Sequence, residues 1–568
     1  MDVIVWFLEP FALGFAQRAL IGGILAGLMS AVVGTWLVLR GMSFFGDAFV
    51  HGVVPGIAAA VVLGIDPAIG AAVAAVVMVA GIELVGRRSM LGEDTAIGLL
   101  FVGMLALGVV IISSIDSYTG SLTSILFGDA LGVTSADLIQ QGALSAAVLV
   151  VSTLMYRPFL ALSFNRQKAE LLGMRPNAAH AAMLALIAAA VIGSYQAVGT
   201  LLVFGLLIGP PATAVLLVRT VPRMMMTAAA IAVVPVWFGL MLSYHLGTAA
   251  SATMSLVPIA AFFVTLAWVR VSTALRTRGA ARDAASPSTP RAEAAGRPTT
   301  AQLPEPTGHA VEGHDVVLRY DGRTAIERSS FSVPAGRITA VIGPNGSGKS
   351  TLLHAVAGLL PAAEGVVRVL GSPPAQARRR VSYVLQTMVV PATTPMTVRE
   401  TVTMGRYPSL GWFRRPSARD RALVREAMDR LGIEHLAERQ LRELSGGQRQ
   451  RVYVAQGLVQ EHDLLLLDEP LTGLDLVSAR AIDRIIHEER DNGGSVLLTT
   501  HDLEEARAAD HVVLTGGRVV SSGPPRMVCR TETLMEAFGL GSVHGWGGFL
   551  DDPAHDPHGH GPPATVGC

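Results

Sequence analysis

The N-terminal half of the chain alternates long apolar runs with short polar stretches. From residue 11 to residue 270 the runs are rich in Ala, Val, Leu, Ile and Gly, and several approach the ~20 residues that a helix needs to cross a bilayer. The pattern predicts membrane spans at 15–39, 48–64, 68–86, 97–115, 138–156, 181–194, 199–218, 226–243 and 254–270. Because the second and sixth are short, we expect an all-α polytopic bundle of about eight to nine spans.

Basic residues favour one orientation for these spans. They gather at the ends of alternate runs, at Arg40, Arg87, Arg88, Arg157, Arg166, Lys168, Arg175, Arg219, Arg223 and Arg270. The loops that join the spans at their other ends contain no Lys or Arg. Because loops rich in Lys and Arg stay in the cytoplasm, the pattern predicts a multi-pass protein whose chain leaves the last span on the cytoplasmic side.

A short apolar strand in the C-terminal half, ITAVI, runs into GPNGSGKST and then into the helical sequence LLHAVAGLL. This order of strand, glycine-rich loop and helix is the setting of a phosphate-binding loop. Its glycines let backbone N–H groups wrap phosphates at the helix N-terminus. We expect Lys349 to neutralise the β- and γ-phosphates and Ser350 to offer its hydroxyl to Mg²⁺. The predicted nucleotide-binding residues are Gly343, Pro344, Asn345, Gly346, Ser347, Gly348, Lys349, Ser350 and Thr351.

Two acidic residues follow a second apolar strand. LLLLDEP, Leu464–Pro470, is a continuous apolar run of the kind found in buried parallel strands. The carboxyl end of such a strand is where α/β sheets bind ligands. We therefore expect Asp468 to hold Mg²⁺ through water and Glu469 to be the general base that polarises the attacking water. A solvated turn is the alternative for two adjacent acids, but a buried strand delivers them to the same sheet edge as the phosphate-binding loop.

Composition agrees with one membrane part and one soluble part. Of the 568 residues, 51% are hydrophobic and 15% are charged, whereas about a quarter are charged in ordinary soluble proteins. Lys+Arg and Asp+Glu both number 44, so net charge gives no indication of a nucleic-acid partner, and none is predicted. The only cysteines, Cys529 and Cys568, lie in the polar half. That half therefore suits a reducing compartment, and no disulfide framework is indicated.

Two segments outside these halves lack apolar periodicity. Residues 275–309 are rich in Ala, Pro, Ser, Thr and Arg and are predicted to be a disordered linker. The tail is rich in His, Gly and Pro, and its cluster of His555, His558 and His560 could bind Zn²⁺ weakly, although a solvated tail fits better. We therefore divide the chain into a membrane domain (1–274), a linker (275–309), an α/β phosphate-loop domain (310–541) and a tail (542–568).

Asp47 and His51 are a polar pair in the membrane half. They lie four residues apart in GDAFVH, so a helix places them on one face. Ionisable groups inside a membrane are expensive and mark functional sites, and a carboxylate beside an imidazole suits a divalent transition metal. The alternative is a helix-end carboxylate and a histidine packed against a neighbouring helix.

A third motif of the C-terminal half is LSGGQRQR, Leu444–Arg451. Together with the phosphate-binding loop and LLLLDEP, it resembles the motifs of ABC ATPases along residues 311–540. The resemblance implies that Tyr320 stacks on the adenine of ATP, that Gln386 senses Mg²⁺, and that His501 contacts the γ-phosphate. It also implies two composite ATP sites in a homodimer, where a nucleotide bound to one copy meets signature residues and an inter-subunit loop of the other: Ser445, Gly446, Gly447, Gln448 and Asp475.

The membrane half contains three further motifs: RGMSFFGDAFVHGVVPGIAAA (Arg40–Ala60), ILFGDALGVT (Ile125–Thr134) and VGTLLVFGLLIGPPATA (Val198–Ala214). They resemble the permeases of zinc and manganese ABC importers over most of residues 11–270. The resemblance implies import across the cell membrane, an external solute-binding protein, and a metal pathway lined by Asp47 and His51. Such importers usually keep permease and ATPase as separate chains, whereas this chain joins them.

Pro210 and Pro211 are predicted to break or kink the seventh span.

Three other functions remain open. They are import of a metal chelate such as a siderophore, haem or cobalamin, export, and nucleotide-dependent sensing without transport. The many short Gly- and Ala-rich spans differ from the six long helices with cytoplasmic extensions expected of an exporter half. The residues do not choose between Zn²⁺ and Mn²⁺, because a pathway of carboxylate and imidazole passes either ion.

Overall fold

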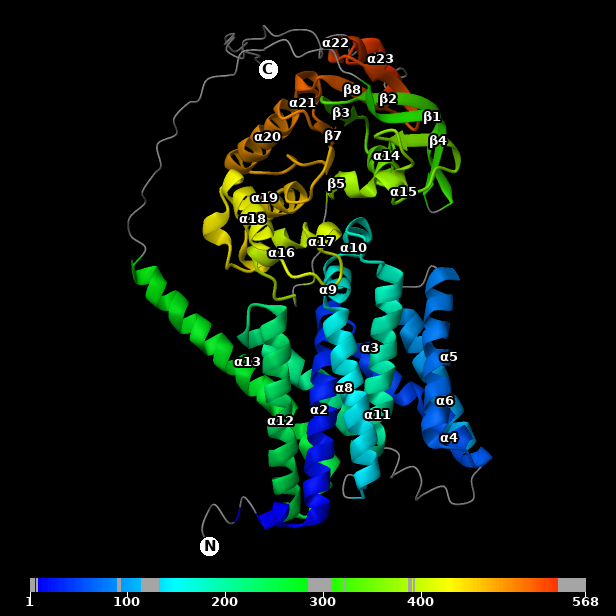
Figure 1. The fold of residues 1–568 in the computed structure, drawn as a ribbon, viewed down its shortest axis with the longest axis vertical. Helices are drawn as coiled ribbons and strands as arrows, with labels where there is room; N and C mark the ends of the chain where they lie inside the picture. The colour runs from blue at the N-terminus through cyan, green and yellow to red at the C-terminus, as the bar shows by residue number, and fades with distance from the viewer. Residues whose placement is uncertain are drawn as a thin grey trace, which may run out of the picture. The chain divides into compact units, whose positions relative to one another are not determined.

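The computed structural model describes residues 6, 9–88, 93–113, 132–283, 308–320, 322–386, 391 and 394–539 (Figure 1). The chain divides into two compact units. Unit 1 is Met1–Ala301 with Thr387–Val459, and unit 2 is Gln302–Gln386 with Gln460–Cys568. The segment expected to form one phosphate-loop domain is thus shared: its strands and phosphate-binding loop are in unit 2, and LSGGQRQR is in unit 1.

Helices build the membrane part of unit 1. They are η1 (Glu9–Ala12), α2 (Gly14–Arg40), α3 (Ser43–Gly52), α4 (Val54–Leu63), α5 (Pro67–Arg88), α6 (Glu93–Ser113), α8 (Ser135–Leu154), α9 (Tyr156–Phe164), α10 (Arg166–Leu171), α11 (Pro176–Leu217), α12 (Val221–Leu246) and α13 (Ala250–Asp283). Among the described residues, six helical stretches are long and apolar enough to cross a membrane, and three shorter apolar helices accompany them. Each predicted run coincides with one of these stretches, which confirms the helical membrane bundle.

Helix α11 unites two spans that the sequence pattern separates. Its 42 residues continue through Pro210 and Pro211, so of the predicted break or kink the break does not occur. Pro211 has no N–H for the carbonyl of Leu207, four residues earlier. That carbonyl instead lies against Gly34 of α2, where an added Cβ would be 1.7 Å from the oxygen. Thr213 Oγ1 also donates to the Gly209 carbonyl at 2.8 Å in the same turn of the helix.

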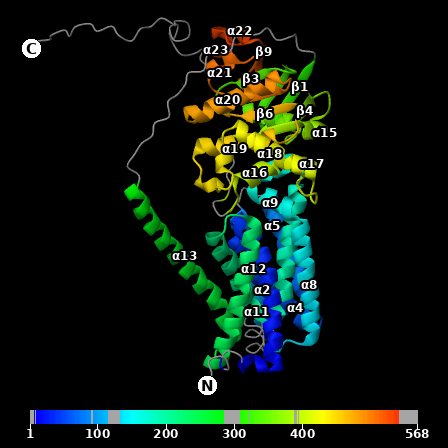
Figure 2. The same cartoon turned by 60° about the vertical axis from the view of Figure 1, so that its left-hand side comes forward.

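Small residues also bring other membrane helices together. Gly56 of α4 and Gly70 of α5 face each other's backbone, and a Cβ on either would lie 2.1 Å from the other's carbonyl oxygen. Lipid provides no hydrophobic drive between helices, so such close backbone approach supplies the packing energy. Helix α2 lies beside α12 in both Figure 1 and Figure 2. Its buried Trp36 donates to Ser152 Oγ of α8 at 3.0 Å.

A second group of helices belongs to unit 1 and surrounds LSGGQRQR. It comprises α16 (Val398–Met404), α17 (Tyr407–Leu410), α18 (Ala418–Arg430), η3 (Glu434–Leu436), η4 (Leu441–Glu443) and α19 (Gly446–Leu458). Arg406 and Asp420 form a buried ion pair at 2.9 Å, and Arg406 also donates to the Val459 carbonyl. Hydrogen bonds from Ser417 at the start of α18, together with Arg406, lower the pKa of Asp420 to about 2.

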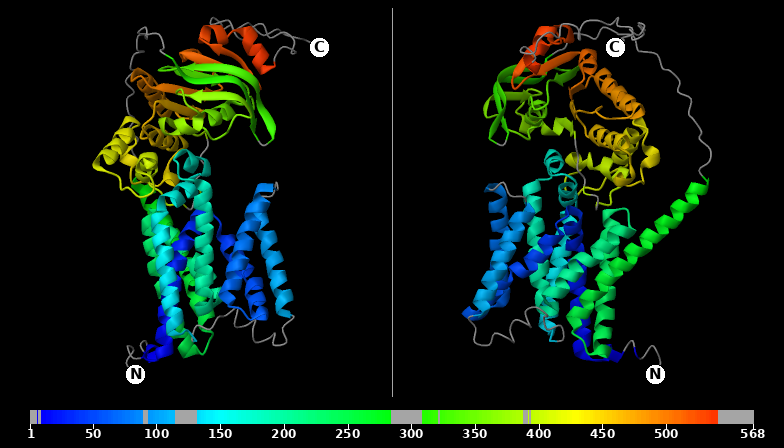
Figure 3. Two further views of the ribbon diagram at one scale, coloured as in Figure 1. Left: turned by 45° about the vertical axis from the view of Figure 1, so that its right-hand side comes forward. Right: turned by 180° about the vertical axis from the view of Figure 1, so that it is seen from behind.

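Unit 2 contains two sheets, visible in Figure 3. The antiparallel sheet has the order β2-β1-β4, and the larger sheet has the order β5-β6-β7-β3-β8-β9, parallel except for the pair β8 and β9. The strands are β1 (His309–Tyr320), β2 (Arg323–Pro334), β3 (Ile338–Ile342), β4 (Glu364–Val369), β5 (Val381–Val384), β6 (Leu464–Asp468), β7 (Ser495–Thr500), β8 (His511–Thr515) and β9 (Val519–Gly523). The helical elements are α14 (Lys349–Val356), α15 (Pro374–Ala377), η2 (Arg378–Arg380), α20 (Leu476–Asp491), α21 (Leu503–Ala508), α22 (Pro525–Val528) and α23 (Thr531–Phe538).

The order of the larger sheet explains where its chemistry gathers. Strands β3, β6 and β7 are neighbours, parallel, and buried along their whole length. Their carboxyl ends therefore meet at one edge. The phosphate-binding loop, the acidic pair and His501 each follow one of these strands and are brought to that edge.

The segments outside the halves are only partly described. Helix α13 continues to Asp283 and so includes residues 275–283 of the expected linker. Residues 284–307 and the tail with its histidine cluster lie outside the described residues.

We predict that Gly34→Ala destabilises the bundle. Its methyl group meets the backbone of Leu207, and overpacking of this kind costs about 1–3 kcal/mol, which exceeds the gain in helix propensity of about 1 kcal/mol. The midpoint of thermal unfolding in detergent should fall by several degrees. Gly103→Ala in α6 is the matched control, because nothing lies within 4 Å of its added Cβ. An unchanged midpoint for Gly34→Ala would show that α2 and α11 are not held at this distance.

Candidate functional site

A cavity of about 620 Å³ opens at the carboxyl edge of the parallel strands in unit 2. Its walls come from the start of β2 and from the segments that follow β3, β5, β6 and β7. Its lining residues are Ala325, Asn345, Gly346, Gly348, Lys349, Ser350, Thr351, Gln386, Glu469, Thr472 and His501. Most of them are residues that the motifs predict, and the structure brings these together. Ala325 and Thr472 are additional.

The phosphate-binding loop is fixed by its glycines and by Lys349. Gly348 has a φ of +94°, which favours glycine, and an added Cβ would lie 2.7 Å from the Ala325 carbonyl. Lys349 Nζ donates to the carbonyls of Gly343 and Pro344 at 2.8 and 3.0 Å. Burial lowers the pKa of Lys349, although the carboxylates of Glu469 and Asp468 oppose this effect. A cation and a helix N-terminus thus face the same cavity, which is the donor set that phosphate oxygens require.

Asp468 is the centre of a hydroxyl network beneath the cavity. Its Oδ1 accepts hydrogen bonds from Ser350 Oγ at 3.1 Å and from Thr499 Oγ1 at 2.6 Å. Its Oδ2 accepts from the hydroxyl of Tyr383 at 3.2 Å, and burial with the nearby carboxylate raises the pKa of Tyr383. The adjacent hydroxyl and carboxylate oxygens of Ser350 and Asp468 suit a hard cation such as Mg²⁺.

Sequence reasoning missed Thr499 and Tyr383. Thr499 begins TTHD, the run that contains His501, but neither residue was given a role from the sequence. The register of the parallel strands could have indicated Thr499, because Thr499 of β7 pairs with Asp468 of β6.

Glu469 occupies an unusual backbone position at the cavity wall. Its φ is +46°, a conformation that non-glycine residues seldom adopt and that concentrates at functional sites. Its N–H donates to Thr499 Oγ1 at 2.9 Å. Its carboxylate accepts from Gln386 Nε2 at 2.7 Å, and His501 Nδ1 lies 4.0 Å from the same oxygen. Two predicted catalytic residues, Gln386 and His501, therefore lie at the carboxylate of a third, Glu469.

Other predicted nucleotide residues do not line this cavity. Tyr320 lies at the end of β1 and is 49% exposed. Asp475 accepts from the Ser478 N–H and begins α20. Ser445 and Gln448 form a capping box at the start of α19, with Gly446 and Gly447 in its first turn.

The pair Asp47 and His51 lies on α3 of unit 1. His51 Nε2 is 3.6 Å from Asp47 Oδ1, so the predicted common face is confirmed. Their side chains are about one-third exposed, and the His51 ring lies 6.1 Å from that of Phe101. Within the described residues, no group of three or more His, Cys, Asp or Glu could hold a metal ion. The pair by itself offers two ligands.

Within unit 1 the membrane helices contact the helices around LSGGQRQR. Arg157 of α9 donates to the carbonyls of Leu410, Gly411 and Arg414, the second at 2.8 Å, and its guanidinium lies 5.3 Å from the centre of the Tyr407 ring. Because an arginine fork matches several acceptors at once, this side chain fixes the α17–α18 loop against α9.

Comparison with known proteins matches each half of the chain to a protein family. The description "ABC 3 transport family" matches residues 12–269, and "ABC transporter" matches residues 326–472. The zinc transport system ATP-binding protein TroB of Treponema pallidum is 42% identical over 234 residues, 41% of this chain and 88% of that protein. The manganese transport system ATP-binding protein MntB of Listeria monocytogenes is 34% identical over 230 residues, 40% of this chain and 96% of that protein.

Two further similarities concern iron and a solved structure. The chelated iron transport system membrane protein YfeB of Yersinia pestis is 39% identical over 229 residues, 40% of this chain and 77% of that protein. The structure of PsaBC from Streptococcus pneumoniae in complex with Fab shares 32% identity, with a TM-score of 0.43, over 46% of this chain and 95% of that chain. Both predicted resemblances are thereby confirmed: the chain belongs to the ABC transporter family, with an ABC 3 membrane domain and an ATP-hydrolysing domain fused in one polypeptide.

Proposed function

We propose that this protein uses ATP hydrolysis to import Zn²⁺ or Mn²⁺ across the cell membrane, and that an external solute-binding protein delivers the ion. The observation that carries the proposal is the Asp47–His51 pair on a membrane helix of a chain with an ATPase site. Relatives of the ATPase half are named for zinc and for manganese transport. A carboxylate and an imidazole are ligands for either ion.

The two-ligand pair fits passage better than storage. A structural zinc site in a protein has four protein ligands, whereas Asp47 and His51 supply two on one helix face. Water or a second copy would complete the coordination. An ion held by few protein ligands leaves readily, which a transport pathway requires.

Residues around the ATP cavity have distinct roles in this proposal. Lys349 and the loop glycines bind the phosphates, and Glu469 takes the proton of the attacking water. Gln386 and His501 orient the Glu469 carboxylate, to which Gln386 donates. Thr499 and Tyr383 hold Asp468 in place. Mg²⁺, held by Ser350 and Asp468 with Gln386 nearby, would neutralise charge on the phosphates.

We further propose a homodimer. Ser445–Gln448 and Asp475 do not line the cavity that contains Lys349. A second copy would bring its signature residues and its Asp475 loop to the nucleotide, and Tyr320 would close on the adenine from the same chain as Lys349. Two fused chains then contain two membrane domains and two ATP sites.

The Glu469→Gln variant should bind ATP but hydrolyse it at least ~10²-fold more slowly, because the general base is lost while the phosphate ligands remain. Phosphate release and retained nucleotide are measured on the purified chain. Glu532→Gln, an exposed change in α23, is the matched control. Near-normal hydrolysis by Glu469→Gln would remove this residue from its role.

Asp47→Asn and His51→Ala should each assemble and hydrolyse ATP, yet lose most uptake of radioactive Zn²⁺ or Mn²⁺ into proteoliposomes supplied with the binding protein. The reason is loss of a metal ligand without a change in the ATP site. Asp66→Asn, an exposed change before α5, is the control that keeps uptake. Normal uptake by both pathway variants would assign the pair to folding. Accumulation of a ferric chelate, with neither free ion transported, would favour chelate import.

Mixing inactive Lys349→Ala and Ser445→Arg chains should restore part of the ATPase activity. Each dimer of unlike chains then holds one intact composite site, formed by the phosphate-binding loop of the Ser445→Arg chain and the signature residues of the Lys349→Ala chain, whereas dimers of identical chains hold none. Activity is measured after co-reconstitution and compared with each variant alone. A stable monomer with full wild-type activity would contradict the homodimer.

A further inference from the structure

Unit 1 contains a second cavity, of about 800 Å³, that the transport reaction does not use. Its walls come from the C-terminal turns of α8, the first residues of α9, the N-terminal turns of α12, Val32 of α2, and the loop between α17 and α18. Its lining includes Leu149, Met226, Trp412 and Phe413, together with Arg157 and Arg415. The lining is mainly apolar, with arginines among it.

The cavity lies at the cytoplasmic end of the membrane spans. The basic loops that follow α8 and precede α12 place those helix ends in the cytoplasm. Val32 is eight residues before the end of α2 at Arg40, which is about 12 Å along a helix. The cavity therefore extends from the polar interface into the hydrocarbon region.

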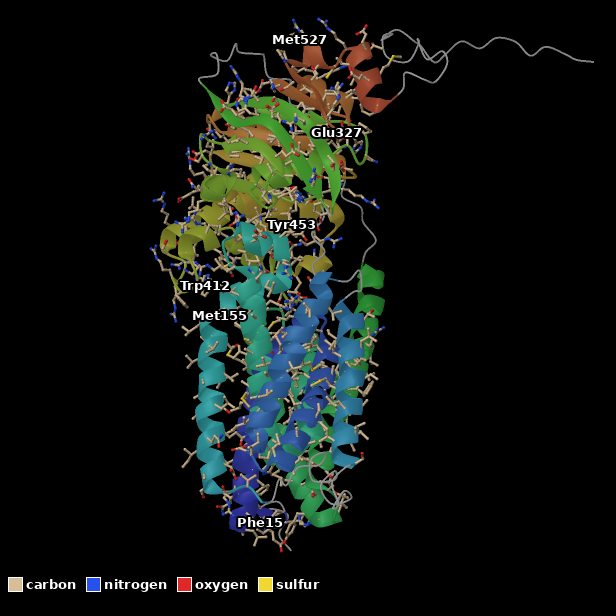
Figure 4. The ribbon with its side chains drawn as sticks, turned by 90° about the vertical axis from the view of Figure 1, so that its right-hand side faces the viewer. Phe15, Met155, Glu327, Trp412, Tyr453 and Met527 are labelled. Carbon is tan, nitrogen blue, oxygen red and sulfur yellow. The ribbon has the colours of Figure 1, made fainter. Side chains whose placement is uncertain are left out.

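The loop that closes the cavity has the composition of a membrane interface. It reads WFRR from Trp412 to Arg415, and Trp412, Phe413 and Arg415 line the cavity. Phe413 and Met226 are each 65% exposed, so apolar side chains on both sides of the opening lack protein cover. Trp with Arg is the combination found at the headgroup level, where the ring is amphipathic and the cation meets lipid phosphate. In Figure 4, Trp412 is labelled close to Met155, the residue after α8.

The two arginines of the lining have different roles. The guanidinium of Arg157 is engaged by the backbone carbonyls of Leu410, Gly411 and Arg414, so it holds the loop in place. Arg415 is exposed, and none of the salt bridges within the described part of the chain involves it. A positive charge therefore stands at the mouth of an apolar cavity. A soluble anion would pair with the positive charge but leave the apolar side chains exposed to water. A zwitterionic lipid would cover the apolar side chains but has no net negative charge to pair with the arginine.

We infer that this cavity holds an anionic phospholipid of the cytoplasmic leaflet, such as phosphatidylglycerol. Its acyl chain packs along α8 and α12, and its phosphate is bound by Arg415. The lipid would then join the membrane helices to the α17–α18 loop, which Arg157 already fixes from the other side.

Native mass spectrometry of the full chain tests the charge preference. Purified protein in detergent is mixed with equal amounts of palmitoyl-oleoyl phosphatidylglycerol and palmitoyl-oleoyl phosphatidylcholine. One phosphatidylglycerol per chain should be retained with about five-fold preference, the effect of one arginine near a lipid phosphate. Arg415→Gln should abolish the preference. Arg419→Gln, an exposed change four residues away that does not line the cavity, should keep it. Equal retention of both lipids by the wild type, or equal loss in both variants, overturns the inference.

Fluorescence quenching tests the location. Phosphatidylglycerol with brominated acyl chains, in nanodiscs of unlabelled phosphatidylcholine, should quench Trp412 more than brominated phosphatidylcholine does. Trp412→Phe should remove this difference. If the difference persists in Trp412→Phe, the anionic lipid binds elsewhere and the inference fails.

Discussion

Asp468 accepts hydrogen bonds from three hydroxyls that belong to three different elements: Ser350 of α14, Thr499 of β7 and Tyr383 of β5. A buried carboxylate is expensive unless such donors satisfy it. The requirement fixes the register between β6 and β7 and holds the helix after the phosphate-binding loop against the sheet. Glu469 follows directly and adopts its strained backbone beside Thr499. The groups that handle ATP are thereby placed before the substrate arrives, which is the main source of electrostatic catalysis.

In the membrane half the corresponding constraint is close backbone approach. Gly34 meets the carbonyl that Pro211 leaves without a donor, and Gly56 meets Gly70. These contacts determine how α2, α4, α5 and α11 pack. Helix α3, which lies between α2 and α4 in sequence, presents Asp47 and His51 on one partly exposed face. Arg157 then joins the membrane helices of unit 1 to the helices around LSGGQRQR through three backbone carbonyls.

Much of this organisation could be predicted from local patterns. The apolar runs, the phosphate-binding loop and the strand before Asp468 are each encoded in fewer than thirty consecutive residues, and the structure contains them all. The unbroken α11 could not be predicted, because Leu207, whose carbonyl loses its donor at Pro211, packs against Gly34, which is far away in sequence. The roles of Thr499 and Tyr383 could not be predicted, because strand pairing brings their side chains to Asp468. The exposed position of Tyr320 and the cavity beside Trp412 likewise depend on tertiary packing.

In the proposed function, one polypeptide couples ATP hydrolysis to inward movement of a transition metal. The measurement uses proteoliposomes that contain the purified wild-type chain. The binding protein and radioactive Zn²⁺ or Mn²⁺ are on the side of the membrane opposite the ATPase domain, and ATP is on the side of the ATPase domain. We expect at least one of the two ions to accumulate on the ATPase side, dependent on ATP and on the binding protein. Sustained ATP hydrolysis with no accumulation of either ion would contradict it.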